Sequence, residues 1–216
     1  MDLTIARRKM IDSQIRPDDV TDERVIAAFE TIPREVFLPK AMSAVAYSEV
    51  ELETVTGNKL WLARDLSKML QALEVKSSDL ALVIGAGEGY SAALLNELAD
   101  TVIALEAEQD VADKAMSLMS DLGSDRVACV SGELTAGFPS EGPYDVILVN
   151  GLVEFVPDAW LEQLSVGGRL GVVVGNQRKG EARIYTRTAG STSYHVEYDC
   201  VPPMLKGVAL EKGFSF

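Results

Sequence analysis

The sequence predicts an α/β fold in which a mostly parallel sheet is covered by helices on both faces and preceded by a helical cap. From residue 80 to residue 174, short apolar runs alternate with helical patterns, as in consecutive βαβ units. The run Leu80–Ile84 leads directly into glycines at positions 85, 87 and 89, and a helical pattern follows at once. A strand, a glycine-rich turn and a helix in this order suit a nucleotide-type ligand.

The N-terminal residues predict the cap. Apolar positions over residues 3–15 follow a loose helical spacing that ends before Pro17. Thr21 offers an N-cap for a second helix, which stops near Pro33. We therefore expect two short helices in this part of the chain.

A segment without a steady period connects the cap to the sheet. Residues 33–58 mix prolines, aromatic residues and acids, and they end in a turn signal. Apolar residues from 60 to 73 then recur at helical spacing. We expect one domain over residues 1–216, with 1–58 as the helical cap and substrate-side segment and 59–216 as the core.

In the core, strands and helices are expected to alternate. The expected strands lie at residues 80–84, 102–105, 127–130, 144–149 and 169–174, and the expected helices at 90–98, 111–122 and 157–164. Gly123 marks a helix end and Pro157 a first helical turn. The tail from 182 to 198 alternates more strictly and contains turn residues, which predicts a closing hairpin of antiparallel strands.

Composition excludes several classes of function. The formal charge of −13 opposes binding to nucleic acid or to an anionic membrane surface, and no apolar run approaches the ~20 residues that span a bilayer. Cys129 and Cys200 lie in apolar settings and are expected to be buried free thiols, and His195 has no neighbours that suggest a metal site. The opening residues lack a secretory signal, so we expect a cytoplasmic location.

The glycine spacing favours one cofactor over others. A dinucleotide fingerprint places a third glycine where this chain has Tyr90, which argues against NAD or FAD and against an NAD-linked oxidoreductase. S-adenosyl-L-methionine is the better match to a glycine loop of this form.

Candidate cofactor residues follow four consecutive strands, and ligands of such sheets lie beyond the carboxyl ends of the strands. Glu106, about 20 residues after the first glycine, can accept hydrogen bonds from ribose hydroxyls. The acid or amide at Gly132–Leu134 can meet an adenine edge, and Asn150 would face the methionine end. The candidate cofactor-binding residues are Gly85, Ala86, Gly87, Gly89, Tyr90, Glu106, Ala107, Gly132, Glu133, Leu134 and Asn150. No residue is assigned as catalytic, because no acid shows a burial signal or a partner.

Several segments together resemble a known family. They are Ile32-Pro-Arg-Glu-Val-Phe-Leu-Pro39, Ala46-Tyr47, the Gly85 loop, Pro143-Tyr-Asp-Val-Ile-Leu-Val149 and Gln163-Leu-Ser-Val-Gly-Gly-Arg-Leu170. In these segments the chain resembles the protein-L-isoaspartate O-methyltransferases. The resemblance implies a Rossmann-like, seven-stranded methyltransferase sheet with its last strand antiparallel, S-adenosyl-L-methionine as cofactor, and a carboxylate of a damaged protein or peptide as methyl acceptor. It also implies that Val201–Gly207 closes the chain near the substrate.

Two positions depart from that family's pattern. Lys59, Leu60 and Trp61 occupy the substrate-side run, and Trp61 stands where the family has an active-site serine. The indole either fills space that a substrate needs or rotates outward. Val83 stands where methyltransferases place an acid that orients the methionine amine, and Asn150 or Glu88 are the candidate substitutes.

Three hypotheses follow. The first is a carboxyl methyltransferase that repairs damaged protein, which needs no general base because a carboxylate is already ionised at neutral pH. The second is a methyltransferase of the same fold with a different acceptor. The third is a binding or regulatory protein that has lost catalysis. The oligomeric state is left open.

Overall fold

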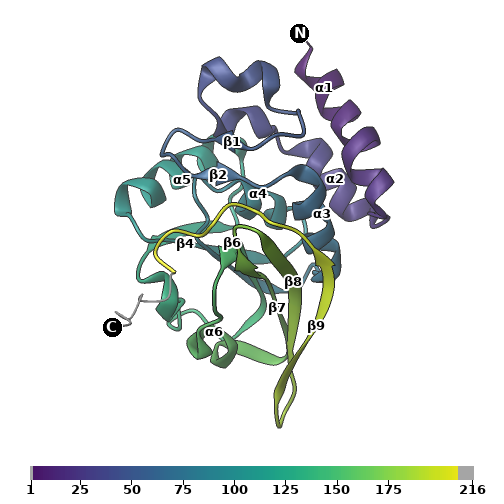
Figure 1. The fold of residues 1–216 in the computed structure, drawn as a ribbon. Helices are drawn as coiled ribbons and strands as arrows, with labels where there is room; N and C mark the ends of the chain where they lie inside the picture. The colour runs from purple at the N-terminus through teal and green to yellow at the C-terminus, as the bar shows by residue number, and fades with distance from the viewer. Residues whose placement is uncertain (1, 209–216) are drawn as a thin grey trace, which may run out of the picture.

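The centre of the protein is a seven-stranded sheet. The computed structural model describes residues 2–208. The strands are β3 (Leu80–Ile84), β4 (Thr101–Glu106), β5 (Val127–Ser131), β6 (Tyr144–Val153), β7 (Leu164–Asn176), β8 (Lys179–Arg187) and β9 (Thr192–Asp199). They are arranged in the order β5-β4-β3-β6-β7-β8-β9 (Figure 1). The predicted α/β architecture is confirmed.

The directions of the strands differ in one detail from the expectation. Strands β3 to β7 pair in parallel, whereas β8 pairs antiparallel with both β7 and β9. The reversed strand is therefore β8, the penultimate one, and the expectation that the last strand alone is reversed was wrong. Two hairpin connections explain this, because the chain turns back after β7 and again after β8. The predicted closing hairpin is confirmed.

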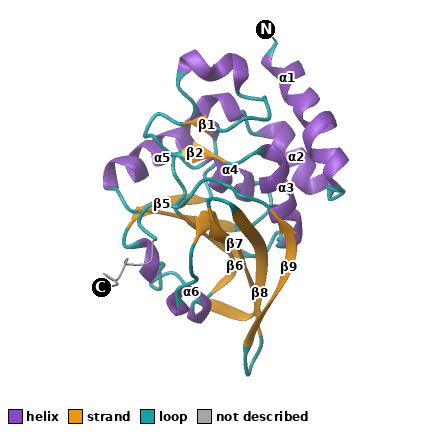
Figure 2. Cartoon of the chain, viewed as in Figure 1, coloured by secondary structure: helices purple, strands orange, loops and turns teal. Residues whose placement is uncertain are grey.

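Helices cover both faces of this sheet (Figure 2). The core helices are α3 (Ala63–Ala72), α4 (Tyr90–Asn96), α5 (Gln109–Leu122) and α6 (Asp158–Glu162). Alternate residues of each central strand belong to two different hydrophobic clusters, as the period of a strand requires. Val83 of β3 packs in the cluster that contains α3, α4 and Met119 of α5, and Ile84 packs in the cluster that contains Trp160 of α6.

The cap contains α1 (Leu3–Met10) and α2 (Glu23–Thr31), and a turn of π-helix, Ile11–Ile15, extends α1. The N-cap of α2 is Asp22, whose carboxylate accepts from the Arg24 amide at 2.9 Å. Thr21, the cap predicted from the sequence, was wrong by one residue, because the Asp22 carboxylate is the side-chain acceptor for the first turn. The amides of Thr21 and Asp22 both donate to Gln71 of α3, at 2.7 and 2.9 Å. Apolar residues of both helices belong to the same hydrophobic cluster as α3 and α4, so the cap and the core share one interior.

The connecting segment has more order than its sequence indicates. It contains 3₁₀ turns at Arg34–Phe37 and Lys40–Val45 and a two-stranded ladder of β1 (Leu52–Glu53) and β2 (Lys59–Leu60). Because Leu60 pairs with Leu52, the helix expected from residue 60 begins only at Ala63. This ladder is a tertiary contact that helical spacing does not reveal.

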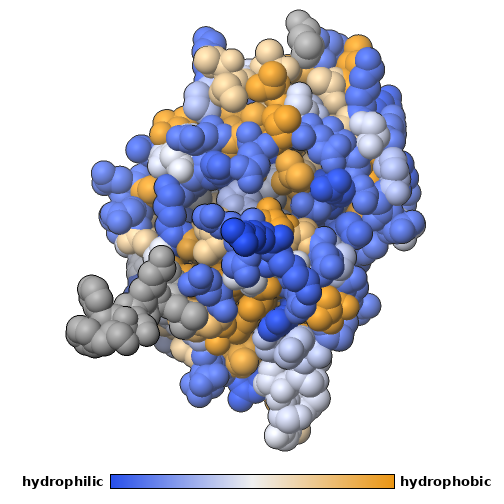
Figure 3. Space-filling view, viewed as in Figure 1, coloured by the Kyte–Doolittle hydropathy of each residue, from blue (hydrophilic) through white to orange (hydrophobic). Residues whose placement is uncertain are grey.

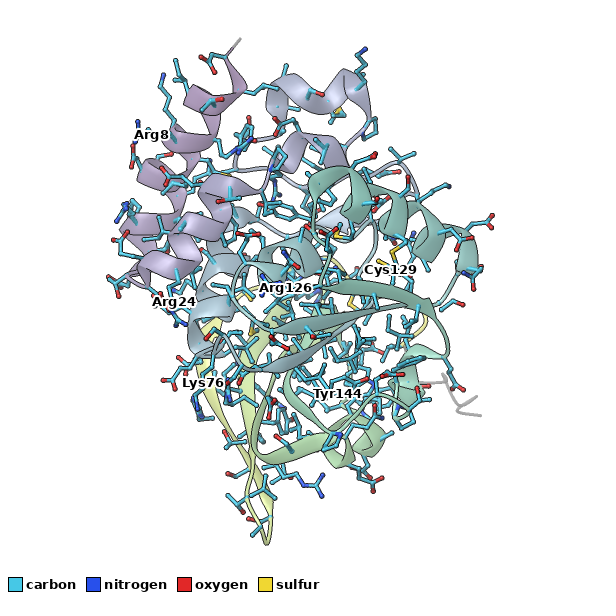
Figure 4. All side chains as sticks on the ribbon, turned by 180° about the vertical axis from the view of Figure 1, so that it is seen from behind. Arg8, Arg24, Lys76, Arg126, Cys129 and Tyr144 are labelled. Carbon is cyan, nitrogen blue, oxygen red and sulfur yellow. The ribbon has the colours of Figure 1, made fainter. Side chains whose placement is uncertain are left out.

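Other boundaries also move where pairing extends an element. The helix expected over 157–164 covers only Asp158–Glu162, because Leu164 already pairs with Tyr144 as the start of β7. Arg126, just before β5, donates to the carbonyls of Asn96 and Ala99 and so joins the strand to the end of α4 (Figure 4). Within residues 2–208, no helix is long and apolar enough to cross a bilayer.

Candidate functional site

A cavity of about 650 Å³ opens beyond the carboxyl ends of β3, β4 and β6. Its floor is the glycine-rich loop, and its other walls are the β1–β2 turn and residues 201–207, which we call the closing segment. Figure 1 shows the closing segment, in yellow, crossing between the β1–β2 ladder and the upper end of the sheet. Figure 3 shows the recess on this face, rimmed mostly by hydrophilic residues. The volume is in the range of small-molecule sites.

The glycine loop gives the cavity a floor of bare backbone. Gly85, Gly87 and Gly89 have φ values of +72°, +59° and +93°, which L side chains adopt only with strain. The amides of Gly85 and Ala86 both donate to the Leu105 carbonyl, at 2.9 and 3.1 Å, so the turn is fixed to β4. A Cβ on Gly87 would lie 3.6 Å from the side-chain nitrogen of Asn58, so the β1–β2 turn packs directly over this glycine.

Glu106 ends β4 and lies directly beside this loop. Its side chain accepts hydrogen bonds from the Gly87 amide at 2.5 Å and from the Ala107 amide at 3.1 Å. Only 8% of the residue is exposed, and this burial raises the pKa of the carboxyl, although the two amides oppose the rise. Two bonds leave further acceptor positions on the carboxylate. Glu106 is therefore a buried acceptor on the cavity wall.

Most of the predicted cofactor residues meet at this cavity. Asn150 donates from its side-chain amide to the Gly85 carbonyl at 2.9 Å, which connects β6 to the glycine loop. The predicted residues that line the cavity are Gly85, Ala86, Gly87, Tyr90, Glu106, Ala107, Leu134 and Asn150. Gly89, Gly132 and Glu133 are not among the lining residues. Glu133 is exposed, and its carboxylate accepts from the Thr135 hydroxyl at 2.6 Å.

The predicted substrate-side residues Lys59, Leu60 and Trp61 also line the cavity. Trp61 is 1% exposed and packs in the cluster of the cap and α3, so its side chain points inward and the outward alternative was wrong. The Trp61 carbonyl accepts from Arg34 at 2.6 Å, and the Arg34 guanidinium lies 5.1 Å from the centre of the Tyr90 ring. The indole is thus a fixed part of the wall between the cap and the glycine loop.

Sequence reasoning missed the polar turn above the loop. Glu88 accepts from the Thr56 amide at 2.8 Å and from the Thr56 hydroxyl at 2.5 Å, and Asn58 donates to that same hydroxyl at 3.1 Å. Both Thr56 and Asn58 line the cavity. The turn signal at 56–58 located the turn, but no spacing rule places it over a loop 30 residues further along the chain.

The closing segment is tied to both the sheet and the cap. Leu152 of β6 donates to Pro203 and accepts from Leu205, each at 2.9 Å, and Lys206 donates to the Gly57 carbonyl at 2.9 Å. A Cβ on Gly85 would lie 2.2 Å from a methyl group of Leu205, so the segment covers the first glycine directly. The side of the cavity near Gly85 is thus enclosed by the closing segment.

The cysteines and the histidine lie outside this cavity; Cys200 is a buried free thiol, as predicted, whereas Cys129 is only partly buried. Cys129, on β5 (Figure 4), is a free, partly buried thiol whose pKa burial raises to about 11, and burial raises the pKa of the free Cys200 thiol to about 12. His195 is exposed on β9 and lies 2.6 Å from Glu197. None of the three lines the cavity.

Comparison with known proteins gives consistent matches. A family model described as protein-L-isoaspartate(D-aspartate) O-methyltransferase matches residues 6–202. The protein-L-isoaspartate O-methyltransferase of Methanoculleus marisnigri is 37% identical over 196 residues, which are 87% of this chain and 89% of the relative. That of Geobacter metallireducens is 39% identical over 179 residues, 82% of each chain.

Solved structures share the fold. A protein-L-isoaspartate O-methyltransferase superposes with a TM-score of 0.80 at 24% identity, covering 92% of this chain and 65% of that one. A Plasmodium falciparum protein described as such an enzyme, in complex with S-adenosyl-L-homocysteine, superposes with a TM-score of 0.77 at 14% identity. That match covers 96% of this chain and 99% of the other. Most of the chain, 92% and 96% in the two matches, therefore shares the fold of these structures.

Proposed function

The chain belongs to the protein-L-isoaspartate(D-aspartate) O-methyltransferase family, and on that premise we propose that it methylates a carboxylate of damaged protein or peptide. S-adenosyl-L-methionine is the methyl donor, and the reaction serves protein repair. One feature of this chain carries the proposal. A buried carboxylate, Glu106, lies beside a glycine floor in a cavity large enough for both a cofactor and part of an acceptor.

The residues present fit this cofactor. Glu106 has acceptor positions left for ribose hydroxyls, and backbone of the glycine loop lines the same cavity. Leu134 provides an apolar wall for an adenine ring, and Asn150 lies beside Gly85 toward the opposite end. When bound, the cofactor supplies a sulfonium methyl group that is already electrophilic. These side chains therefore act by binding and orientation.

The acceptor side needs position more than proton transfer. A carboxylate is ionised at neutral pH, so no residue has to remove a proton from it, and alignment supplies most of the rate increase. The β1–β2 turn, Trp61 and the closing segment enclose the cavity and limit the access of water. The proposed roles of Lys59, Leu60 and Trp61 are thus to shape the acceptor side.

The direct test is the transfer of a labelled methyl group. Purified protein is incubated with methyl-labelled S-adenosyl-L-methionine and a peptide that contains one isoaspartyl residue. The methyl ester formed is then hydrolysed with base, and the labelled methanol that it releases is counted. The matched control is the same peptide with normal aspartate at that position. We expect label only with the isoaspartyl peptide. Binding of the cofactor without transfer to that peptide would rule out this acceptor.

One observation favours a second candidate, a methyltransferase of this fold with another acceptor. The large indole of Trp61 packs in the hydrophobic cluster at the cavity wall, and Arg34 donates to the backbone carbonyl of the same residue. An aromatic wall suits an acceptor that stacks or is apolar. A panel of small carboxylic acids, phenols and amines, assayed with the same labelled donor, separates this candidate from the first. If neither the donor nor S-adenosyl-L-homocysteine shifts the melting temperature, the catalytically inactive alternative gains support.

We also propose that the protein works in the cytoplasm. Its two cysteines are free and at least partly buried, which is consistent with a reducing compartment.

A further inference from the structure

The charges around the cavity are unevenly satisfied. Four glutamates and two lysines line it, namely Glu51, Glu88, Glu106, Glu108, Lys59 and Lys206. Glu51 pairs with Lys59 at 2.7 Å, and the Glu106 side chain accepts from two backbone amides. Glu108 is exposed to solvent. Of the four carboxylates, Glu88 is the buried one that lacks a full set of partners.

The geometry of Glu88 makes this deficit costly. Only 3% of the residue is exposed, and both hydrogen bonds from Thr56 go to the same oxygen, Oε1. The other oxygen, Oε2, is buried and has no hydrogen-bond partner. A buried carboxylate oxygen without a donor is unfavourable, and a positive charge beside it is the strongest remedy. Glu88 lies between Gly87 and Gly89, on the floor of the cavity.

The proposed cofactor carries a group that meets this need. Its methionine end bears an ammonium, which has three donors and a positive charge. The strand that precedes the loop, Leu80–Ile84, contains no acidic residue. Val83, at the position of the missing acid, is fully buried in the hydrophobic cluster. Asn150, the other candidate, could offer an ammonium only its neutral side-chain oxygen, because its amide nitrogen is a donor and binds the Gly85 carbonyl. A carboxylate therefore outcompetes Asn150 as the partner of a cation.

We propose that Glu88 binds the ammonium of the methionine moiety and replaces the acid that is missing at Val83. This assignment rests on the proposed cofactor and names the residue that recognises its charged end. It has a structural consequence, because the same carboxylate holds Thr56 of the β1–β2 turn through Oε1. Cofactor recognition and the position of the acceptor-side turn thus depend on one side chain.

A pair of ligands isolates the ammonium contact. Affinities for S-adenosyl-L-homocysteine and for its analogue with hydrogen in place of the amino group are measured by calorimetry, on wild type and on Glu88→Gln. Glutamine keeps an oxygen for Thr56 but loses the charge. We expect the variant to bind S-adenosyl-L-homocysteine about 10- to 100-fold more weakly, while its affinity for the deaminated analogue changes less than about threefold.

Two controls separate the possible failures. Glu108→Gln removes the same charge from the same cavity and should alter both affinities by the same factor. A melting curve of Glu88→Gln without ligand shows whether the variant folds, and Glu88→Asp, which keeps the charge, provides a second test if it does not. We expect Glu88→Asp to keep most of the preference that wild type shows for S-adenosyl-L-homocysteine over the deaminated analogue.

The outcomes are distinct. If wild type binds neither ligand, the proposed cofactor is wrong. If wild type binds both ligands but Glu88→Gln weakens them equally, or weakens neither, the cofactor stands and the role of Glu88 is refuted. The same refutation follows if wild type shows no preference for the ligand with the amine.

Discussion

Replacement of Glu106 by glutamine should change both the free energy of unfolding and the affinity for the cofactor, because it removes a buried charge and a hydrogen-bond acceptor. The Glu106 side chain accepts from the Gly87 and Ala107 amides, and its burial is the largest cause of its raised pKa. Glutamine keeps one acceptor oxygen but turns an NH₂ group toward the other amide. It also removes a charge that is costly to bury. The change therefore costs a hydrogen bond but relieves desolvation.

The pH dependence of the free energy of unfolding shows whether the charge of Glu106 stabilises or destabilises the folded protein. Because the pKa of Glu106 is raised in the folded state, the native protein holds this proton more tightly than the unfolded chain does. The contribution of Glu106 to stability is full below the unfolded pKa of about 4.3 and is lost as pH rises through the folded pKa. Glutamine does not titrate. The stability of wild type minus that of Glu106→Gln should therefore fall as pH rises from about 4 to 7.

Urea unfolding at several pH values measures this difference, and calorimetry measures cofactor binding by the same variant. Loss of one hydrogen bond to a charged acceptor costs about 1.5–3 kcal/mol, so we expect affinity for S-adenosyl-L-homocysteine to fall about 10- to 100-fold. A ligand that lacks the ribose 2′-hydroxyl should show a smaller loss. A stability difference that rises with pH, or an unchanged affinity, would refute the reasoning about Glu106.

Three further predictions concern stability and reactivity. Gly89→Ala places a side chain at φ +93° and should lower the free energy of unfolding by about 1–2 kcal/mol, whereas Gly190→Ala, in open space, should change it little; equal losses in urea melts would contradict this. Arg169→Met leaves the buried carboxylate of Asp79 without its cationic partner at 2.7 Å, although the Lys76 amide still donates to it, and should cost about 3–5 kcal/mol, with part regained in Arg169→Met/Asp79→Asn; a single-variant loss below about 1 kcal/mol would count against it. Burial raises the pKa of Cys129 to about 11, so labelling of this thiol in the native protein, followed by mass spectrometry, should be slow at pH 8 and accelerate about tenfold per pH unit up to pH 10; a rate that is half-maximal near pH 8.5 and levels off by about pH 10 would show an ordinary thiol.

The sequence alone determined the framework and the floor of the site. The strand at Leu80–Ile84 and the helix end at Gly123 were located correctly, because a buried parallel strand and a helix stop depend on local composition. The glycine spacing and Glu106 follow from the chain order of a βαβ unit, which fixes which strand ends lie side by side. Gly85, Gly87 and Glu106 line the cavity for this reason, whereas Gly89 does not.

Tertiary structure decided what surrounds that floor. Thr56 donates to Glu88, and Lys206 donates to the Gly57 carbonyl, only when the cap and the closing segment have folded over the sheet. The inward position of Trp61 depends on the packing of the cap, and Glu133 lies off the cavity, where its carboxylate accepts from the Thr135 hydroxyl. Local sequence patterns report the nearest few residues, whereas these contacts join segments dozens of residues apart. The unsatisfied oxygen of Glu88 is visible only once all its neighbours are in place.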